Sequence, residues 1–119
     1  MNKNAETWVA ALRSGKYSQT RGVLRDDRGY CCLGVACQLY ADAMGIEWNE
    51  GVEYRFDGEE MVLPLSVKMW LGLNGDSGRY YDSVNDVEEY SLAKANDDGM
   101  SFGGIASIIE SEPDGLFIE

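Results

Sequence analysis

The sequence predicts an α+β fold in which antiparallel hairpins pack against about four short helices. Three observations support this prediction. Apolar residues recur at helical spacing in several short segments, glycine-containing turn signals lie between alternating segments, and no β-α-β unit repeats along the chain. With 119 residues, 45% of them hydrophobic, the chain has the size and the apolar content of a single globular domain spanning residues 1–119.

The first predicted helix covers residues 5–14. Asn4 is its expected N-cap, and Gly15 is expected to stop it. Its apolar residues follow the i, i+3, i+4, i+7 spacing of an amphipathic helix: Ala5, Trp8, Val9 and Leu12. Trp8 is therefore expected to face the core.

A hairpin is predicted next, from extended segments at residues 19–24 and 30–33. Between them lies the run DDRG at residues 26–29, whose glycine is able to take a positive φ, so we expect a turn of about four residues. A central helix is expected from about residue 33 to Met44, because apolar residues return to helical spacing there and Gly45 suits a helix end. Cys32, Leu33 and Val35 are expected to be buried, since the hairpin leads directly into this helix.

A second hairpin is predicted around residues 57–58. Aromatic and charged residues alternate over 53–56, the pair Asp-Gly is a strong two-residue turn signal, and apolar residues return over 61–63. A short helix is expected to follow over 64–71, because proline is favoured in the first turn of a helix.

The last part of the chain is predicted to hold a loop and two helices. Residues 74–82 are expected to form the loop, in which Tyr80 and Tyr81 either cover the edge of the core or stand ready for a partner. A helix is expected from about residue 87 to Asn96. Ser101 is the expected N-cap of a final helix with one apolar face, formed by Phe102, Ile105, Ala106 and Ile109.

Charge is distributed unevenly along the chain. Residues 1–44 contain six basic and four acidic side chains and carry +2, whereas residues 45–119 contain four basic and seventeen acidic ones and carry −13, which gives the net charge of −11. Nucleic acid is expected to be repelled, because its binding depends on Lys and Arg that neutralise phosphates. The excess suits a partner with a basic surface, or alternatively it only keeps a small protein in solution.

Two sets of charged residues are candidate binding sites. The partner-binding candidates fall in the second hairpin and in a loop-like region where side chains reach solvent: Glu59, Glu60, Asp82, Asp86, Glu88 and Glu89. A competing set surrounds the end of the first helix and the first hairpin: Arg13, Lys16, Arg21, Arg25 and Arg28. These basic residues either hold an anionic ligand such as a nucleotide or pair with the acidic remainder of the protein.

The amino-acid content of the chain excludes several kinds of catalytic and metal chemistry. The chain contains no histidine, which removes Ser-His-Asp and Cys-His catalysis and the usual zinc ligand. Cys31, Cys32 and Cys37 lack C-x-x-C spacing, so we expect them to be structural; a thiolate nucleophile would need a neighbouring Lys or Arg to lower its pKa. The polar turn at residues 96–99 does not match a calcium-binding loop. We therefore expect no metal and no cofactor, and we assign no catalytic residue.

Membrane and DNA-binding functions are not predicted either. No stretch approaches the roughly 18 apolar residues of a membrane span, and the first residues lack the pattern of a signal peptide, so a cytoplasmic location is expected. The final predicted helix leaves no room for a basic recognition helix after it, which excludes a helix-turn-helix.

Seven motifs are distributed along most of the chain: WVAALRSGKYSQ at 8–19, YCCLGVAC at 30–37, LP at 63–64, WLGL at 70–73, ND at 96–97, SF at 101–102 and IA at 105–106. Together they resemble the motifs of a family of small uncharacterised proteins of tailed bacteriophages and prophages. The resemblance carries no active site that is transferable to this chain. It implies an accessory protein in the cytoplasm of an infected bacterium, where such proteins often bind and disable or redirect host machinery.

The sequence leaves three functions open. The first is a non-enzymatic binding protein whose acidic surface engages a basic host protein, as an inhibitor that imitates the charge of phosphate. The second is binding or sequestration of a small anionic ligand by the arginine-rich hairpin. The third is an enzyme whose active site the sequence does not reveal.

Overall fold

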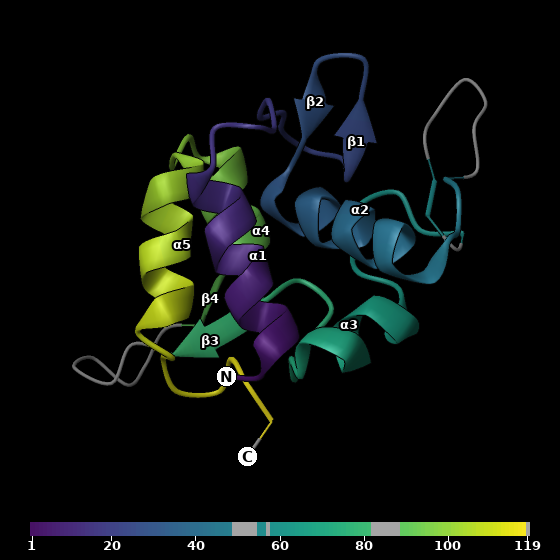
Figure 1. The fold of residues 1–119 in the computed structure, drawn as a ribbon. Helices are drawn as coiled ribbons and strands as arrows, with labels where there is room; N and C mark the ends of the chain where they lie inside the picture. The colour runs from purple at the N-terminus through teal and green to yellow at the C-terminus, as the bar shows by residue number, and fades with distance from the viewer. Residues whose placement is uncertain (49–54, 57, 82–88, 119) are drawn as a thin grey trace.

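A computed structural model describes residues 1–48, 55–56, 58–81 and 89–118 (Figure 1). This part of the chain contains five helices and two antiparallel hairpins of two strands each, so the predicted α+β class is confirmed. In chain order the elements are α1 (Lys3–Arg13), β1 (Arg25–Asp26), β2 (Gly29–Tyr30), α2 (Cys32–Met44), α3 (Leu65–Leu71), β3 (Arg79–Tyr81), β4 (Glu89–Ser91), α4 (Leu92–Asp97) and α5 (Phe102–Glu110).

Helix α1 packs against both α5 and α2 (Figure 1). All four residues of its predicted inward face are buried, and the indole Nε1 of Trp8 donates a hydrogen bond to the carbonyl oxygen of Cys32 at 2.9 Å. The predicted N-cap is wrong. Asn2 caps the helix by accepting a hydrogen bond from a first-turn backbone N–H, whereas Asn4 donates to the carbonyl oxygen of Trp70 at 3.0 Å.

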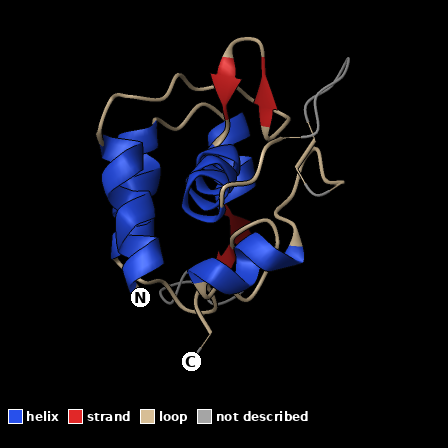
Figure 2. Cartoon of the chain, turned by 45° about the vertical axis from the view of Figure 1, so that its right-hand side comes forward, coloured by secondary structure: helices blue, strands red, loops and turns tan. Residues whose placement is uncertain are grey.

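The first hairpin is shorter than predicted, and it stands at one end of the helical core (Figure 2). The ladder contains only β1 and β2, and residues 19–24 contribute a single parallel bridge between Gln19 and Tyr30, so the strand predicted over 19–24 is wrong beyond that bridge. The strand predicted over 30–33 ends at Tyr30. Two features prevent the longer strands. Gly22 takes a φ of +81° and donates its backbone N–H to the carboxylate of Asp97 at 2.8 Å, and α2 already begins at Cys32.

Helix α2 is confirmed, and its first half is enclosed by the rest of the protein. Cys32, Leu33 and Val35 are fully buried, as predicted. Gly34 has no room for a side chain, because a Cβ there would lie 1.7 Å from the carbonyl oxygen of Leu24. The helix therefore packs directly on the backbone that precedes β1.

The turn of the second predicted hairpin is present, although its second strand is not. Phe56 and Glu59 exchange two backbone hydrogen bonds of 2.9 Å in an antiparallel bridge, with Gly58 at a φ of +84° between them. Residues 53, 54 and 57 lie outside the described residues. Residues 61–63 form no strand, because the N–H of Leu63 donates to the carbonyl oxygen of Asp76 instead. Helix α3 follows as predicted.

The region predicted as a loop followed by a long helix contains a hairpin. The loop predicted over 74–82 ends in β3, and the helix predicted from about residue 87 is replaced by β4 up to Ser91. Helix α4 then begins at Leu92, because the side chain of Ser91 caps it by accepting a hydrogen bond from the N–H of Lys94 at 3.0 Å. Residues 82–88 lie outside the described residues.

Helix α5 and the segment after it close the core on the side opposite α2. Ser101 caps α5 as predicted, and its four expected inward residues are all buried. Beyond the helix, the chain forms isolated bridges with the end of β3, between Asp114 and Tyr81, and with the segment just after α3, between Phe117 and Leu73. In the described part of the chain, no helix has the length and the apolar character needed to span a bilayer.

Candidate functional site

Two of the six predicted partner-binding residues lie together. Glu59 and Glu89 are far apart in the sequence but line one pocket of about 580 Å³, and Glu89 is exposed. Glu60 forms an ion pair with Arg55, with 2.6 Å between Arg55 Nη2 and Glu60 Oε1, so its charge is partly balanced. The remaining three candidates, Asp82, Asp86 and Glu88, lie outside the described residues.

The pocket shared by Glu59 and Glu89 carries charges of both signs. Lys68 from α3 and Arg79 from β3 line it as well, together with the carboxylate of Asp76. Ligand cavities are lined mostly by apolar side chains, whereas charged side chains line this pocket. We therefore interpret it as a polar contact surface. Residues of the second turn, of α3, of the segment between α3 and β3, and of the β3–β4 hairpin together form this surface.

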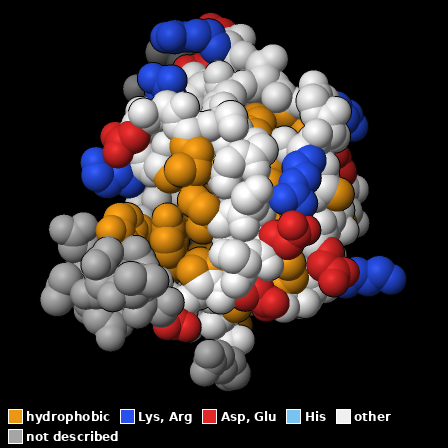
Figure 3. Space-filling model, turned by 90° about the vertical axis from the view of Figure 1, so that its left-hand side faces the viewer, with side chains coloured by type: hydrophobic (Ala, Val, Ile, Leu, Met, Phe, Trp, Pro, Cys, Tyr) orange, Lys and Arg blue, Asp and Glu red, His pale blue; other side chains and the backbone are white. Residues whose placement is uncertain are grey.

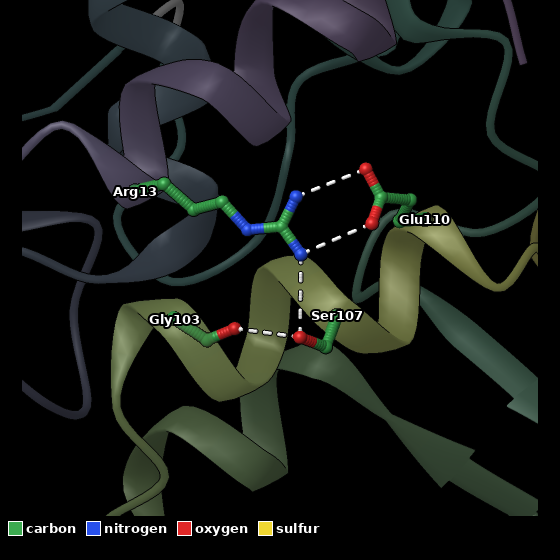
Figure 4. A network of polar contacts seen from close by, with 4 residues as sticks. All are labelled: Arg13, Gly103, Ser107 and Glu110. Carbon is green, nitrogen blue, oxygen red and sulfur yellow. Dashed lines mark hydrogen bonds and ion pairs between the residues drawn. The ribbon is translucent and has the colours of Figure 1, made fainter.

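The basic candidate set is distributed over several internal contacts. Arg13 donates two hydrogen bonds to the carboxylate of Glu110, at 2.9 and 3.1 Å, and a third to the hydroxyl of Ser107 at 3.3 Å (Figure 4). The hydrogen bonds between Arg13 and Glu110 lower the pKa of Glu110 and raise the pKa of Arg13. Arg13 thus joins α1 to α5 and is engaged within the fold.

Other members of this set also contact the protein itself. The guanidinium of Arg25 lies over the rings of Tyr30 and Trp48, at 5.3 and 5.4 Å from their centroids, and Lys16 lies over the ring of Tyr17 at 5.6 Å. The Arg21 guanidinium packs beside Gly99, while Arg28 is exposed at the tip of the first hairpin. Among the described residues, none of the five basic side chains lines any of the four main pockets. The structure does not bring them together as one anion site.

The β3–β4 hairpin presents tyrosines between two further pockets. Tyr80 and Tyr90 are direct partners in the register, and their rings stack with centroids 5.6 Å apart and planes 21° from parallel. One pocket, of about 600 Å³, lies between these rings and the turn that follows α5; the other, of about 680 Å³, lies between them and α4. Figure 3 shows hydrophobic side chains gathered in a band on the face that carries α5.

The two neighbouring tyrosines of β3 have different environments. Tyr80 is half-buried and covers the core edge, whereas Tyr81 is exposed. Tyr90 and Asp114, which share a pocket with both, were not predicted as site residues. The sequence did contain a signal for Tyr90. A polar run rich in turn-forming residues separates it from Tyr80 and Tyr81, and such a run between aromatic residues is typical of a hairpin.

The three cysteines are buried, which fits the structural role expected for them. The sulfur of Cys31 caps α2 by accepting a hydrogen bond from the N–H of Gly34 at 3.4 Å. Burial raises the pKa of the Cys31 thiol to about 11 and raises the pKa values of Cys32 and Cys37 as well. A thiolate nucleophile therefore has no support at these positions. Within the described residues, no three Cys, Asp or Glu side chains converge as metal ligands.

Residues of three sequence motifs meet in one buried hydrogen-bond network. Asn96 is fully buried; its Oδ1 accepts from Gln19 Nε2 at 2.8 Å and from the N–H of Cys32 at 3.1 Å, and its Nδ2 donates to the carbonyl oxygen of Thr20 at 2.8 Å. The motifs at 8–19, 30–37 and 96–97 are thus connected through their hydrogen bonds. Their residues hold α4, α2 and the intervening chain in place and do not line an open site.

Comparison with known proteins identifies a family and no characterised relative. A search of curated proteins and a search of solved structures each gave no match. The chain matches the family described as Domain of unknown function (DUF8296) over residues 1–113. Because this match covers all five helices and both hairpins, the chain belongs to the DUF8296 family.

Proposed function

We propose that this protein is a non-enzymatic accessory protein of a tailed bacteriophage or prophage that binds a basic protein of the bacterial host. Its acidic surface would serve as the binding surface and imitate the phosphate charge to which such a partner normally binds. The observation that carries the proposal is the meeting of three carboxylates, of Glu59, Asp76 and Glu89, at one pocket, where they outnumber Lys68 and Arg79, on a chain with a net charge of −11.

The magnitude of the charge supports a binding role. Solubility of a small domain needs a net charge of only about 2–8 in magnitude, so −11 exceeds that need. Complementary charge accelerates encounter with an oppositely charged partner and selects it over neutral ones. Residues 45–119 also present exposed apolar side chains, among them Met61, Leu65 and Met69, and Leu65 lines the same pocket as Glu59 and Glu89. Apolar side chains of this kind add contact area to a charged interface.

The competing function, binding of an anionic ligand, receives less support. It requires several of the five basic side chains to converge, whereas Arg13 pairs with Glu110 and Arg25 lies over two aromatic rings. An anion would have to displace these contacts before it bound.

A capture experiment separates the two functions. The immobilised protein is exposed to a bacterial lysate at about 50 mM and at about 500 mM salt, and the retained proteins are identified. The variant Glu59→Lys/Glu89→Lys is expected to lose the salt-sensitive proteins that the wild type retains, while Arg21→Gln/Arg25→Gln is expected to keep them. Retention that is unchanged in the first variant and lost in the second would replace this proposal with the anionic-ligand function.

A further inference from the structure

The pocket between the β3–β4 hairpin and the turn after α5 combines aromatic rings with carboxylates. Its volume is about 600 Å³, within the range of about 300–1,000 Å³ that is typical of ligand pockets. The described residues of its lining include three tyrosines, the apolar side chains of Ile108 and Pro113, and two carboxylates. The residues are Tyr80, Tyr81, Tyr90, Ile108, Ser111, Glu112, Pro113 and Asp114.

The fold fixes Tyr81 next to Asp114. The N–H of Tyr81 donates to the carbonyl oxygen of Asp114 at 2.8 Å, in an antiparallel bridge. The following residue, Gly115, has a φ of +83°, and a Cβ there would lie 2.8 Å from Cδ2 of the Tyr81 ring. Asn74 anchors the same segment by donating from Nδ2 to the carbonyl oxygens of Gly115 and Phe117, at 3.1 and 2.9 Å. The ring and the carboxyl-bearing residue are therefore positioned before any ligand binds.

The charged residues of this pocket differ from those of the two pockets on the other sides of the β3–β4 hairpin. The pocket of Glu59 and Glu89 contains Lys68 and Arg79, and the pocket beside α4 contains Lys94, which pairs with Asp98 at 3.2 Å. No Lys or Arg of the described residues lines the tyrosine pocket.

The two carboxylates of the tyrosine pocket are not equivalent. Glu112 contacts the amino group of Met1, whereas no ion pair connects Asp114 to a described residue. Asp114 is thus the carboxylate best placed to attract a cation.

We propose that this tyrosine pocket binds an arginine side chain of the basic partner, an inference that rests on the proposed function. A planar guanidinium stacks on tyrosine faces and donates paired hydrogen bonds to a carboxylate, so Tyr81 and Asp114 match its two recognition features. Arginine is favoured over lysine because its guanidinium is more weakly hydrated and gains more from the flat, partly apolar lining. The partner's arginine is recognised here, while Glu59 and Glu89 attract its other basic residues.

Titration with a capped amino acid tests the pocket on its own. N-acetyl-arginine methylamide is added to the ¹⁵N-labelled protein, and the lysine derivative serves as the comparison probe. The arginine probe is expected to shift the amide signals of Tyr81, Asp114 and Gly115 and to bind more tightly than the lysine probe. Shifts confined to other parts of the chain, or equal binding of both probes, would overturn the proposal.

Variants then assign the contacts. Asp114→Asn is expected to weaken binding of the arginine probe about tenfold, because a charged hydrogen-bond acceptor is lost. Asp98→Asn is the matched control, since it removes one exposed carboxylate near the same hairpin outside this pocket, and it is expected to bind as the wild type does. Tyr81→Leu keeps the apolar volume without the aromatic face and is expected to weaken binding as well. Unchanged affinity in both Asp114→Asn and Tyr81→Leu would refute the pocket.

An oligo-arginine peptide distinguishes failure of the pocket from failure of the proposed function. If Glu59→Lys/Glu89→Lys weakens peptide binding and Asp114→Asn does not, the acidic surface binds basic partners and the pocket proposal is wrong. If the capped arginine binds at Asp114 and the affinity for the peptide is the same in the wild type and in Glu59→Lys/Glu89→Lys, the pocket proposal is supported and the proposed function is wrong.

Discussion

Replacing Asn96 by alanine is expected to destabilise the fold more than its position in a short helix would suggest. The side chain is fully buried and makes three hydrogen bonds, to Gln19, Cys32 and Thr20. Gln19 keeps a partner in the variant, because its Nε2 also donates to the carbonyl oxygen of Met100 at 2.8 Å. The N–H of Cys32 and the carbonyl of Thr20 would both lose theirs.

The expected loss follows from these two backbone groups. Each buried group left without a partner costs about 1–3 kcal/mol, so Asn96→Ala should lower the free energy of unfolding by about 4 kcal/mol. That is a large share of the roughly 5–15 kcal/mol that stabilises a typical domain. Asn74→Ala is the matched control, because Asn74 donates two hydrogen bonds but is exposed; its loss should be about 1 kcal/mol or less.

Urea unfolding measured by tryptophan fluorescence gives both values, since Trp8 is fully buried and reports on the core. The wild type and the two variants are compared at equal protein concentration, and the slopes of the transitions are checked for agreement. A loss for Asn96→Ala below about 1 kcal/mol, or equal to that of Asn74→Ala, would refute the view that this network holds the fold together.

Three further predictions concern the core and its thiols. Leu33→Ala should lower the free energy of unfolding by about 2–5 kcal/mol, because Leu33 is fully buried, and a change below about 0.5 kcal/mol in urea unfolding would contradict this. Gly34→Ala should cost about 3 kcal/mol or prevent folding, because the new methyl group would overlap the carbonyl of Leu24; a variant with a wild-type melting temperature would show that the contact yields easily. The thiols of Cys31, Cys32 and Cys37 should react with iodoacetamide at pH 8 far more slowly in the folded protein than in urea, since burial raises their pKa values; equal rates would argue for an accessible thiolate.

Helices α1, α2 and α5 were predictable because their apolar spacing agrees with their final packing. The inward faces of α1 and α5 follow from positions three and four residues apart, and the caps of α2 and α5 stand where turn-forming residues stand in the sequence. Local pattern and tertiary packing favour the same structure in these segments.

The strands were harder to predict, because whether a segment pairs depends on residues that are distant in the sequence. Residues 19–24 look extended, yet the backbone of Thr20 and Gly22 is hydrogen-bonded by Asn96 and Asp97, a pairing that no local pattern reveals. Likewise, β4 was predicted as helix because its pairing with β3 crosses a polar run of the chain. A sequence pattern of period two over three residues is too short to outweigh the helical pattern beside it.

The candidate site was predictable in its charge and not in its shape. Charge counting selected Glu59 and Glu89, but only the fold brings both to one pocket. Asp114 was not predicted as a site residue because its place next to Tyr81 comes from a bridge between residues that are far apart in the sequence. In contrast, the five basic residues were a candidate site in the sequence, but the fold does not bring them together. Arg13 pairs with Glu110, and Lys16 and Arg25 lie over aromatic rings.

The acidic binding surface is tested most directly by the salt dependence of association with an octa-arginine peptide. Affinity is measured by fluorescence anisotropy from low to high salt for the wild type, for Glu59→Lys/Glu89→Lys, and for the control Asp27→Lys/Glu47→Lys. The control changes the net charge by the same amount at exposed residues outside the four main pockets. We expect the first variant to bind much more weakly and with a flatter salt dependence than the control. Equal losses in the two variants would contradict the proposed surface, because net charge alone would then govern binding.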